Sequence, residues 1–294
     1  MKKYYRICQQ NIVLSLPFLP KENPDWRAFE CGGFGEQSPD IELVCGIGIP
    51  DITPADKKAG TSGDFEVYSN EKTAKRLFKL AESGDGVVAE YALSGGSRAD
   101  VTATRRAFTC ALDDRYLWAV TALSQLMLFK NTVFLHSSYI SVGGKAVLFS
   151  APCGTGKSTQ ADLWVKYADA RLINGDKAGI SIRDNKITAH GLPFCGTSGV
   201  CKNESYPLGA IVLLSQGREN TVTRLGAAQC VSALTGNIYL DLLAPGERER
   251  LFLFLFELIE KIPVYSFACT PDDDAVKILK ARFEKDGVIC ADRL

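Results

Sequence analysis

The chain has 294 residues, of which 46% are hydrophobic, so it can bury a large core in one domain or two. Its 34 lysines and arginines balance its 34 aspartates and glutamates, which argues against a nucleic acid or an anionic membrane as partner. The apolar run LFLFLF at 251–256 is far too short to span a bilayer and has charged neighbours on both sides. We therefore expect a globular protein that binds neither nucleic acid nor membrane.

The amino-terminal segment MKKYYRICQQNIVLSLPFLP is interpreted as a first strand and not as a signal peptide, because polar residues interrupt its apolar stretch and no small-residue cleavage site follows. The ten cysteines are scattered, with no CxxC pair and no Cys/His cluster, which is typical of a cytoplasmic protein with reduced thiols. Cys195 and Cys201 flank a glycine-rich segment, where a redox or metal role can be imagined. Their spacing fits no common zinc motif, so small buried thiols are the favoured interpretation.

Residues 1–115 are predicted to form a β-rich region that recognises a substrate or a partner. Strand-like runs alternate there with polar, glycine-bearing loops: Ile12–Leu16, Ile41–Val44, Phe65–Tyr68, Val87–Leu93 and Val101–Leu112. A linking helix is expected over 116–130, because two aspartates precede it and apolar residues recur at helical spacing. Its apolar face comprises Tyr116, Val120, Leu123 and Met127.

Strands and helices alternate over residues 131–294, which predicts a nucleotide-binding α/β domain with a mixed sheet. VFLHSS, YISVGG followed by KAVLFSA, and RLINGD are expected as strands, and AGISIRDNKITAH as a hairpin around Asp184 and Asn185. LGAIVLLSQ and NTVTRL are expected as two strands joined by a glycine-containing turn, and GERERLFLFLFELIEK as a helix. The last helix is expected to have Thr270 as its N-cap and Pro271 at its first position.

The segment KAVLFSAPCGTGKST at 145–159 has the order of a buried strand, a glycine-containing loop and a helix start. In a phosphate-binding loop (P-loop), backbone N–H groups surround the β-phosphate, a lysine reaches the β and γ oxygens, and a hydroxyl binds Mg2+. Lys157 and Ser158 would take the last two roles; the alternative is a glycine-rich turn with an incidental lysine. Ala151 replaces the first glycine of the Walker A pattern, which is tolerable only if Ala151 keeps a negative φ. The residues expected to bind nucleotide are Ala151, Pro152, Cys153, Gly154, Thr155, Gly156, Lys157, Ser158 and Thr159.

Phosphoryl transfer also needs an acid that holds the metal or positions the acceptor hydroxyl. Asp176 is the first candidate, because it ends the strand-like RLIN run just after the loop helix; the alternative is a turn-capping aspartate in NGDK. His136 ends the VFLHSS run, from which its imidazole would lie near the phosphates and act on the proton of Asp176. His190 is interpreted as a strand-end residue that opens HGLPFCGTSG, a loop expected to close on a substrate.

The segment LHSSYISVGGKAVLFSAPCGTGKST resembles the HPr kinases and the PEP carboxykinase-like kinases, in which a histidine on the preceding strand leads through a hairpin into the P-loop. RLINGDKAGI resembles the element that follows, and the resemblance covers roughly residues 130–294. It implies an α/β fold with a P-loop-containing, mixed-sheet kinase core of this type, preceded by the β-rich region. It also implies that Ala151 to Ser158 bind nucleotide, that His136 assists proton transfer and that Asp176 is a metal ligand or base.

Two departures from the family pattern bear on the substrate. Gly175 and Asp176 stand where the HPr kinases carry paired aspartates, and KITAHGLPFCGTSG lacks the glutamate of their glycine-rich signature. HPr is therefore not the expected acceptor, and the chain looks more like related kinases of bacterial gene clusters that modify peptides or small molecules. The GTSG loop with its two flanking cysteines would then face the acceptor.

These observations predict a cytoplasmic, ATP-dependent and Mg2+-dependent kinase that phosphorylates a hydroxyl of a small molecule, peptide or protein, with GTP as an alternative donor. Its expected catalytic residues are Lys157, Asp176 and His136, and its expected metal ligands are Ser158 and Asp176. Two other classes stay open: an adaptor that senses ATP or GTP without transfer, and an NTPase whose hydrolysis drives a conformational change. The oligomeric state is also open, a homo-oligomer included.

Overall fold

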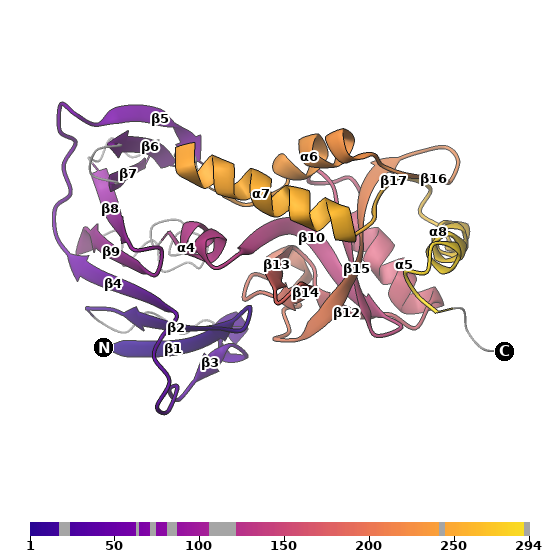
Figure 1. The fold of residues 1–294 in the computed structure, drawn as a ribbon, viewed down its shortest axis with the longest axis horizontal. Helices are drawn as coiled ribbons and strands as arrows, with labels where there is room; N and C mark the ends of the chain where they lie inside the picture. Colours follow the sequence, from indigo (N-terminus) through magenta and orange to yellow (C-terminus); the bar gives the residue numbers. More distant parts are fainter. Residues whose placement is uncertain are drawn as a thin grey trace. The chain divides into compact units, whose positions relative to one another are not determined.

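The computed structural model of the chain describes residues 1–17, 24–62, 65–70, 75–80, 87–105, 122–240 and 245–290 (Figure 1). The chain divides into two compact units, Met1–Lys130 with Leu240–Arg250 and Asn131–Tyr239 with Leu251–Leu294. Each unit contains a sheet with both parallel and antiparallel pairs, so the protein is a mixed α/β protein. No helix in the described part of the chain is long and apolar enough to cross a membrane.

The first unit is built on a nine-stranded sheet of order β3-β1-β2-β4-β9-β8-β7-β6-β5. Only the pairs β2–β4 and β4–β9 are parallel among the strand pairs of this sheet that the structure describes. The β-rich character predicted for this part of the chain is confirmed. The strands are β1 Lys2–Ile7, β2 Gln10–Ser15, β3 Glu30–Cys31, β4 Ile41–Ile47, β5 Lys57–Ser62, β6 Phe65–Asn70, β7 Lys75–Leu80, β8 Val87–Ser94 and β9 Arg98–Ala103.

Two predictions for the first unit reach beyond the described residues. The strand expected over Val101–Leu112 is wrong in its length, because β9 ends at Ala103, and residues 106–112 lie outside the described part. The predicted linking helix is described only as α4, Leu123–Phe129, whose residues up to Leu128 are buried. Tyr116 and Val120 lie outside the described residues. A short helix, α1, spans Pro24–Arg27.

A buried ion pair holds helix α7 (Pro245–Lys261) to strand β7 within the first unit. The guanidinium of Arg76 lies 2.6 Å from a carboxylate oxygen of Glu247, and both side chains are less than a tenth exposed, at 7% and 8%. Arg76 also donates to the hydroxyl of Tyr91 at 3.3 Å. Glu247 lies in the first turn of α7, where the helix dipole favours a negative charge. A buried charge needs such partners, because an unpaired one costs several kcal/mol.

The second unit is built on an eight-stranded sheet of order β11-β10-β13-β14-β15-β17-β16, with β12 paired to β10. An additional parallel pairing of β11 with β15 closes strands β11, β10, β13, β14 and β15 into a ring. The mixed sheet predicted here is confirmed. The strands are β10 Thr132–Val142, β11 Lys145–Ser150, β12 Arg171–Asn174, β13 Lys177–Arg183, β14 Lys186–Gly191, β15 Ser205–Gln216, β16 Thr221–Arg224 and β17 Val264–Cys269.

Strand β10 changes partners in its middle. Its residues Thr132–His136 pair with β13, whereas Ser137–Val142 pair with β11. VFLHSS and YISVGG therefore belong to one continuous strand, and the prediction that His136 ends a strand is wrong. His136 instead lies at the last pair with β13 before the partner changes. Its side chain is partly exposed, whereas its neighbours on both sides are buried.

Helices α5 (Lys157–Tyr167) and α8 (Asp273–Lys285) pack against each other and share an aromatic core with the sheet (Figure 1). Trp164 lies at the centre of this core, with its ring 6.1 Å from that of Phe149 and 5.6 Å from that of Phe283. All three are fully buried, so α5 is fixed to β11 at the point where the chain leaves the strand. The described part of this unit also contains α6 Ala227–Thr235, the 3-10 turn η1 Gly196–Ser198 and the part of α7 from Leu251 onward.

Two local predictions for the second unit are confirmed and one is wrong. The hairpin of β13 and β14 turns at Asp184 and Asn185, whose φ values of 48° and 63° suit a type I′ turn. Strands β15 and β16 follow each other through a turn that contains Gly217, as expected, and β17 lies between them in the sheet. The N-cap of α8 is Asp272, not Thr270: the carboxylate of Asp272 accepts from the backbone N–H of Ala275, so the helix begins at Asp273.

Candidate functional site

The loop predicted to bind phosphate joins strand β11 to helix α5. Gly154 and Gly156 have φ values of 78° and 114°, which a side chain would strain, and no atom lies within 4 Å of where their Cβ would be. Their backbone is therefore open to a ligand. Ala151, the departure from the Walker A pattern, is buried and is not among the residues with positive φ, so its methyl group is accommodated without strain.

Lys157, at the start of α5, folds back over this loop. Its ammonium donates to the carbonyl oxygens of Ala151 and Pro152 at 2.9 and 3.1 Å, and the residue is 8% exposed. Burial lowers the pKa of Lys157, while the neighbouring Cys153 and Asp176 act in the opposite direction. Ser158 and Thr159 lie beside it and are exposed, in the first turn of α5, where backbone N–H groups have no partner within the helix. The arrangement offers one ammonium, two hydroxyls and a positive helix end to an anion.

A buried asparagine shapes the turn that carries Asp176. The side-chain oxygen of Asn174 accepts from the backbone N–H groups of Asp176 and Lys177 at 2.8 and 2.9 Å. Its nitrogen donates to the carbonyl of Leu192 at 2.8 Å, and the residue is fully buried. Asn174 was not singled out from the sequence, although asparagine is a known turn-forming residue because its side chain can bond to the backbone two residues on.

His136, Asp176 and Lys177 form a row of charged and polar groups. The Nδ1 atom of His136 lies 3.4 Å from a carboxylate oxygen of Asp176 and 3.1 Å from its backbone carbonyl. The other carboxylate oxygen of Asp176 accepts from the ammonium of Lys177, which also lies over the rings of Phe194 and Tyr239 at 5.5 and 5.2 Å. Lys177 is a further residue that sequence reasoning missed, although it directly follows the predicted acid.

The positive charge of Lys157 acts on the group formed by His136, Asp176 and Lys177. Burial is the main cause that lowers the pKa of His136, followed by the positive charge of Lys157, and the carboxylate of Asp176 only partly offsets them. His136 is therefore a neutral imidazole at pH 7. The structure thus brings the three predicted catalytic residues, His136, Lys157 and Asp176, within electrostatic reach of one another.

The glycine-rich segment after β14 lies against the Asp176 turn. A Cβ on Gly196 would be 2.7 Å from the Cβ of Asp176, and one on Gly175 would be 2.4 Å from the Cβ of Ser198. Gly175 therefore has no room for a side chain, which explains physically why a second aspartate does not stand there. The segment is bonded to the turn by the N–H of Gly175, which donates to the carbonyl of Val200 at 3.3 Å.

His190 belongs to the core and not to the site. It lies one residue before the end of β14, paired with Gly179 and Ser205, in agreement with its interpretation as a strand-end residue, and the following loop begins after Gly191. Its two ring nitrogens are each 2.7 Å from a serine hydroxyl, that of Ser181 and that of Ser205. Burial lowers the pKa of His190 to about 3, so the ring is neutral and structural.

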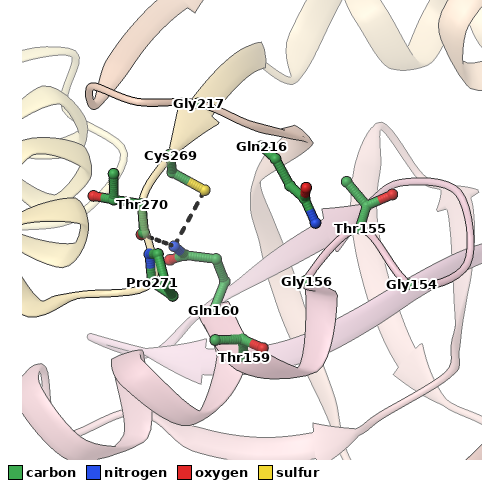
Figure 2. A pocket seen from close by; sticks show the side chains of 10 residues that line it. All are labelled: Gly154, Thr155, Gly156, Thr159, Gln160, Gln216, Gly217, Cys269, Thr270 and Pro271. Carbon is green, nitrogen blue, oxygen red and sulfur yellow. Dashed lines mark hydrogen bonds between the residues drawn. The ribbon is translucent and has the colours of Figure 1, made fainter.

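A pocket of about 380 Å³ opens beside the loop (Figure 2). Strands β11, β15 and β17 are parallel neighbours, and the pocket lies at their carboxyl ends, where ligands of α/β sheets commonly bind. In Figure 2, Thr155 and Gln216 lie on one side, and Gln160 faces Cys269, to whose sulfur it donates at 3.3 Å. The lining residues are Gly154, Thr155, Gly156, Thr159, Gln160, Gln216, Gly217, Cys269, Thr270 and Pro271.

Sequence reasoning found the loop side of this pocket but missed its far side. Gln216 ends β15 and Cys269 ends β17, and both become neighbours of the loop only through the parallel pairing of the strands. The signal that was available is positional, since both residues directly follow apolar strand runs. That the strands are parallel could not be derived from those runs alone.

No protein-family model matches this chain, and no curated protein matches it. Among solved structures, a match is found with the HPr(Ser) kinase/phosphatase from Coxiella burnetii. Its TM-score is 0.34 and its sequence identity 9%, and the match covers 52% of this chain and 97% of that chain. The likeness concerns the fold alone, and at this TM-score it does not bear on the site.

Proposed function

We propose that the protein is an ATP-dependent and Mg2+-dependent kinase that transfers a γ-phosphoryl group to a hydroxyl of a small molecule, peptide or protein. The proposal is carried by one observation: the buried Lys157, at an open glycine loop, lies within electrostatic reach of the carboxylate of Asp176. Phosphoryl transfer needs this combination of a cationic phosphate clamp and an acid that positions the acceptor. The pocket beyond Gly156 would take the nucleoside, of ATP or alternatively of GTP.

In the proposed mechanism Lys157 exchanges its two bonds to loop carbonyls for bonds to phosphate oxygens. Ser158 and Asp176 supply hydroxyl and carboxylate oxygens, the donors that Mg2+ prefers, so the residues fit this ion. When bound, Mg2+ would neutralise the charge that develops between the β- and γ-phosphates.

Asp176 orients the acceptor hydroxyl and takes its proton as the new O–P bond forms and the bond to the leaving ADP breaks. The ammonium of Lys177 is bound to the carboxylate of Asp176 and holds it in place at the turn. The neutral His136 lies at the same carboxylate and can accept the proton from it afterwards.

The proposal is tested by incubating the protein with γ-labelled ATP, Mg2+ and a cell extract, and identifying the species that becomes labelled. We expect labelling that disappears when Mg2+ is chelated. In a Lys157→Ala variant we expect nucleotide affinity, measured by calorimetry, to fall by about 100-fold, since charge-assisted bonds to phosphate are lost, and labelling to disappear. Lys166→Ala removes an exposed lysine of the same helix and should change neither. Unchanged nucleotide affinity in Lys157→Ala would contradict the proposal.

A second candidate is an adaptor that senses ATP or GTP without transferring phosphate. It is favoured by the single acid at the turn, since Gly175 leaves no room for a partner carboxylate. Tight nucleotide binding that depends on Lys157, without label on any acceptor in several extracts, would support this class over the kinase.

A further inference from the structure

Two cysteines close the base of the segment that packs on the Asp176 turn. Cys195 and Cys201 are separated by GTSGV, and their sulfur atoms lie within 4.8 Å of each other. Both residues are partly buried. A pair of sulfurs this close can be joined by a small movement, since a disulfide needs a separation of about 2 Å.

The segment between the two cysteines has backbone freedom for that movement. Gly196 and Gly199 have φ values of 57° and 65°, and no regular strand or α-helix runs through the segment. It touches the Asp176 turn at several points: Cys201 forms a backbone bridge to Asn174, the carbonyl of Val200 accepts from the N–H of Gly175, and Gly196 packs against the side chain of Asp176. A covalent link between the cysteines would therefore act on the turn that positions Asp176.

We propose that Cys195 and Cys201 are a reversible thiol modification site that forms an intramolecular disulfide by exchange with a low-molecular-weight disulfide such as oxidised glutathione. One cysteine thiolate attacks a glutathione sulfur and releases the first glutathione thiolate. The second cysteine thiolate then attacks the cysteine sulfur of this mixed disulfide and releases the second. Two cysteines are oxidised, one glutathione disulfide is reduced to two thiols, and the two cysteine protons end on glutathione.

The disulfide would slow phosphoryl transfer and leave nucleotide binding unchanged. This effect rests on the proposed function. The ring holds residues 195–201 against Asp176, where the acceptor hydroxyl must arrive. The described lining of the nucleotide pocket contains neither cysteine. We expect oxidation to lower the turnover number for phosphoryl transfer several-fold, while the dissociation constant for ATP stays the same.

Trypsin provides a direct readout, because cleavage after Lys186 and Lys202 gives the peptide ITAHGLPFCGTSGVCK, which contains both cysteines and no other. The folded full-length chain is equilibrated in glutathione buffers of increasing oxidising strength, alkylated and digested with trypsin. The mass of the peptide is then measured by mass spectrometry. We expect this peptide to lose the mass of two hydrogens and to resist alkylation, and dithiothreitol to reverse both changes. Cys290→Ser, which removes an exposed cysteine elsewhere, should behave like the wild type.

In the single variants Cys195→Ser and Cys201→Ser, the peptide should never lose the mass of two hydrogens. It should carry one glutathione or one alkyl group instead. Double alkylation of the wild-type peptide in every buffer, or glutathione that persists on it without ring closure, would overturn the modification site. A disulfide that forms without changing turnover would overturn its link to Asp176. Failure of the reduced protein to bind ATP would contradict the proposed function alone, because the peptide mass does not depend on nucleotide.

Discussion

One carboxylate oxygen of Asp176 is bound by Lys177, and the other lies 3.4 Å from the Nδ1 atom of His136. We expect Asp176→Asn to leave ATP affinity within a few-fold of the wild type, because Lys157 and the loop are unchanged. Turnover should fall by about 100- to 10,000-fold, since an amide cannot take the proton of the acceptor. Parallel measurement of the dissociation constant and of label transfer separates the two effects. Asp162→Asn, on the exposed side of α5, is the matched control, and equal turnover in Asp176→Asn would exclude its role.

The protonation of His136 predicts how the turnover for phosphoryl transfer changes at acidic pH. Burial and Lys157 lower the pKa of His136 below the ordinary value of 6.5, so the imidazole is neutral above that pH. Transfer should therefore be constant from pH 6.5 upward on this account and should decline only as the pH falls through the lowered pKa. The measurement is turnover against pH for the wild type and His136→Gln. The variant should lack this decline, and a decline centred above pH 6.5 would contradict the assignment.

The glycine loop between β11 and α5 and the positions of His136 and Asp176 near it could be predicted from the sequence, because each is part of a local pattern of strand, turn and helix. Asn174 and Lys177 could not be assigned, because their roles depend on Leu192, Phe194 and Tyr239, which reach the turn through the fold. The pocket residues Gln216 and Cys269 were missed for the same reason. The order of strand, loop and helix along the chain predicted the loop, whereas the pairing of distant strands determines which side chains lie opposite the loop.

At the scale of helices and strands, features set by neighbouring residues could be predicted, whereas features set by contacts between distant segments could not. The hairpin of β13 and β14 was predictable because Asp184 and Asn185 lie next to each other and favour positive φ. The placement of β16 was not, since its partner β17 lies far along the chain. The cap of α8 was misplaced because Thr270 binds Asn220 instead, which leaves the N-cap position to Asp272.

The strands β13, β14 and β15 enclose His190, and this predicts a pH dependence of stability. The pKa of His190 is about 3 in the folded protein and about 6.5 when unfolded, so its contribution is complete above pH 6.5. As the pH falls from 6.5 towards 3, only the unfolded chain gains this proton, and the free energy of unfolding should fall by up to about 1.4 kcal/mol per pH unit. Urea unfolding of the wild type and His190→Gln at several pH values measures the difference. Parallel curves would show that His190 is not buried as a neutral ring.

At the scale of the whole molecule, the buried pair of Arg76 and Glu247 joins positions far apart in the chain. We expect Glu247→Ala to lower the free energy of unfolding by about 3–5 kcal/mol, because it leaves the guanidinium buried without its carboxylate. Chemical denaturation measures this loss. Glu249→Ala removes an exposed glutamate of the same turn and should have little effect. The double variant Arg76→Met with Glu247→Leu should recover much of the loss, and a neutral Glu247→Ala would show that the pair is solvated.

The same ion pair decides how the gene can be divided. A fragment that stops after Lys130 would contain every strand of the nine-stranded sheet, yet it would lack residues 240–250 and with them Glu247. Such a fragment should be poorly expressed or aggregate, although its sequence looks like a complete β-rich domain. An independently folding version would need residues 240–250 fused back through a linker. A truncation at position 130 that lost an activity would therefore have lost it through misfolding, and the loss would not show that the deleted residues bind a ligand.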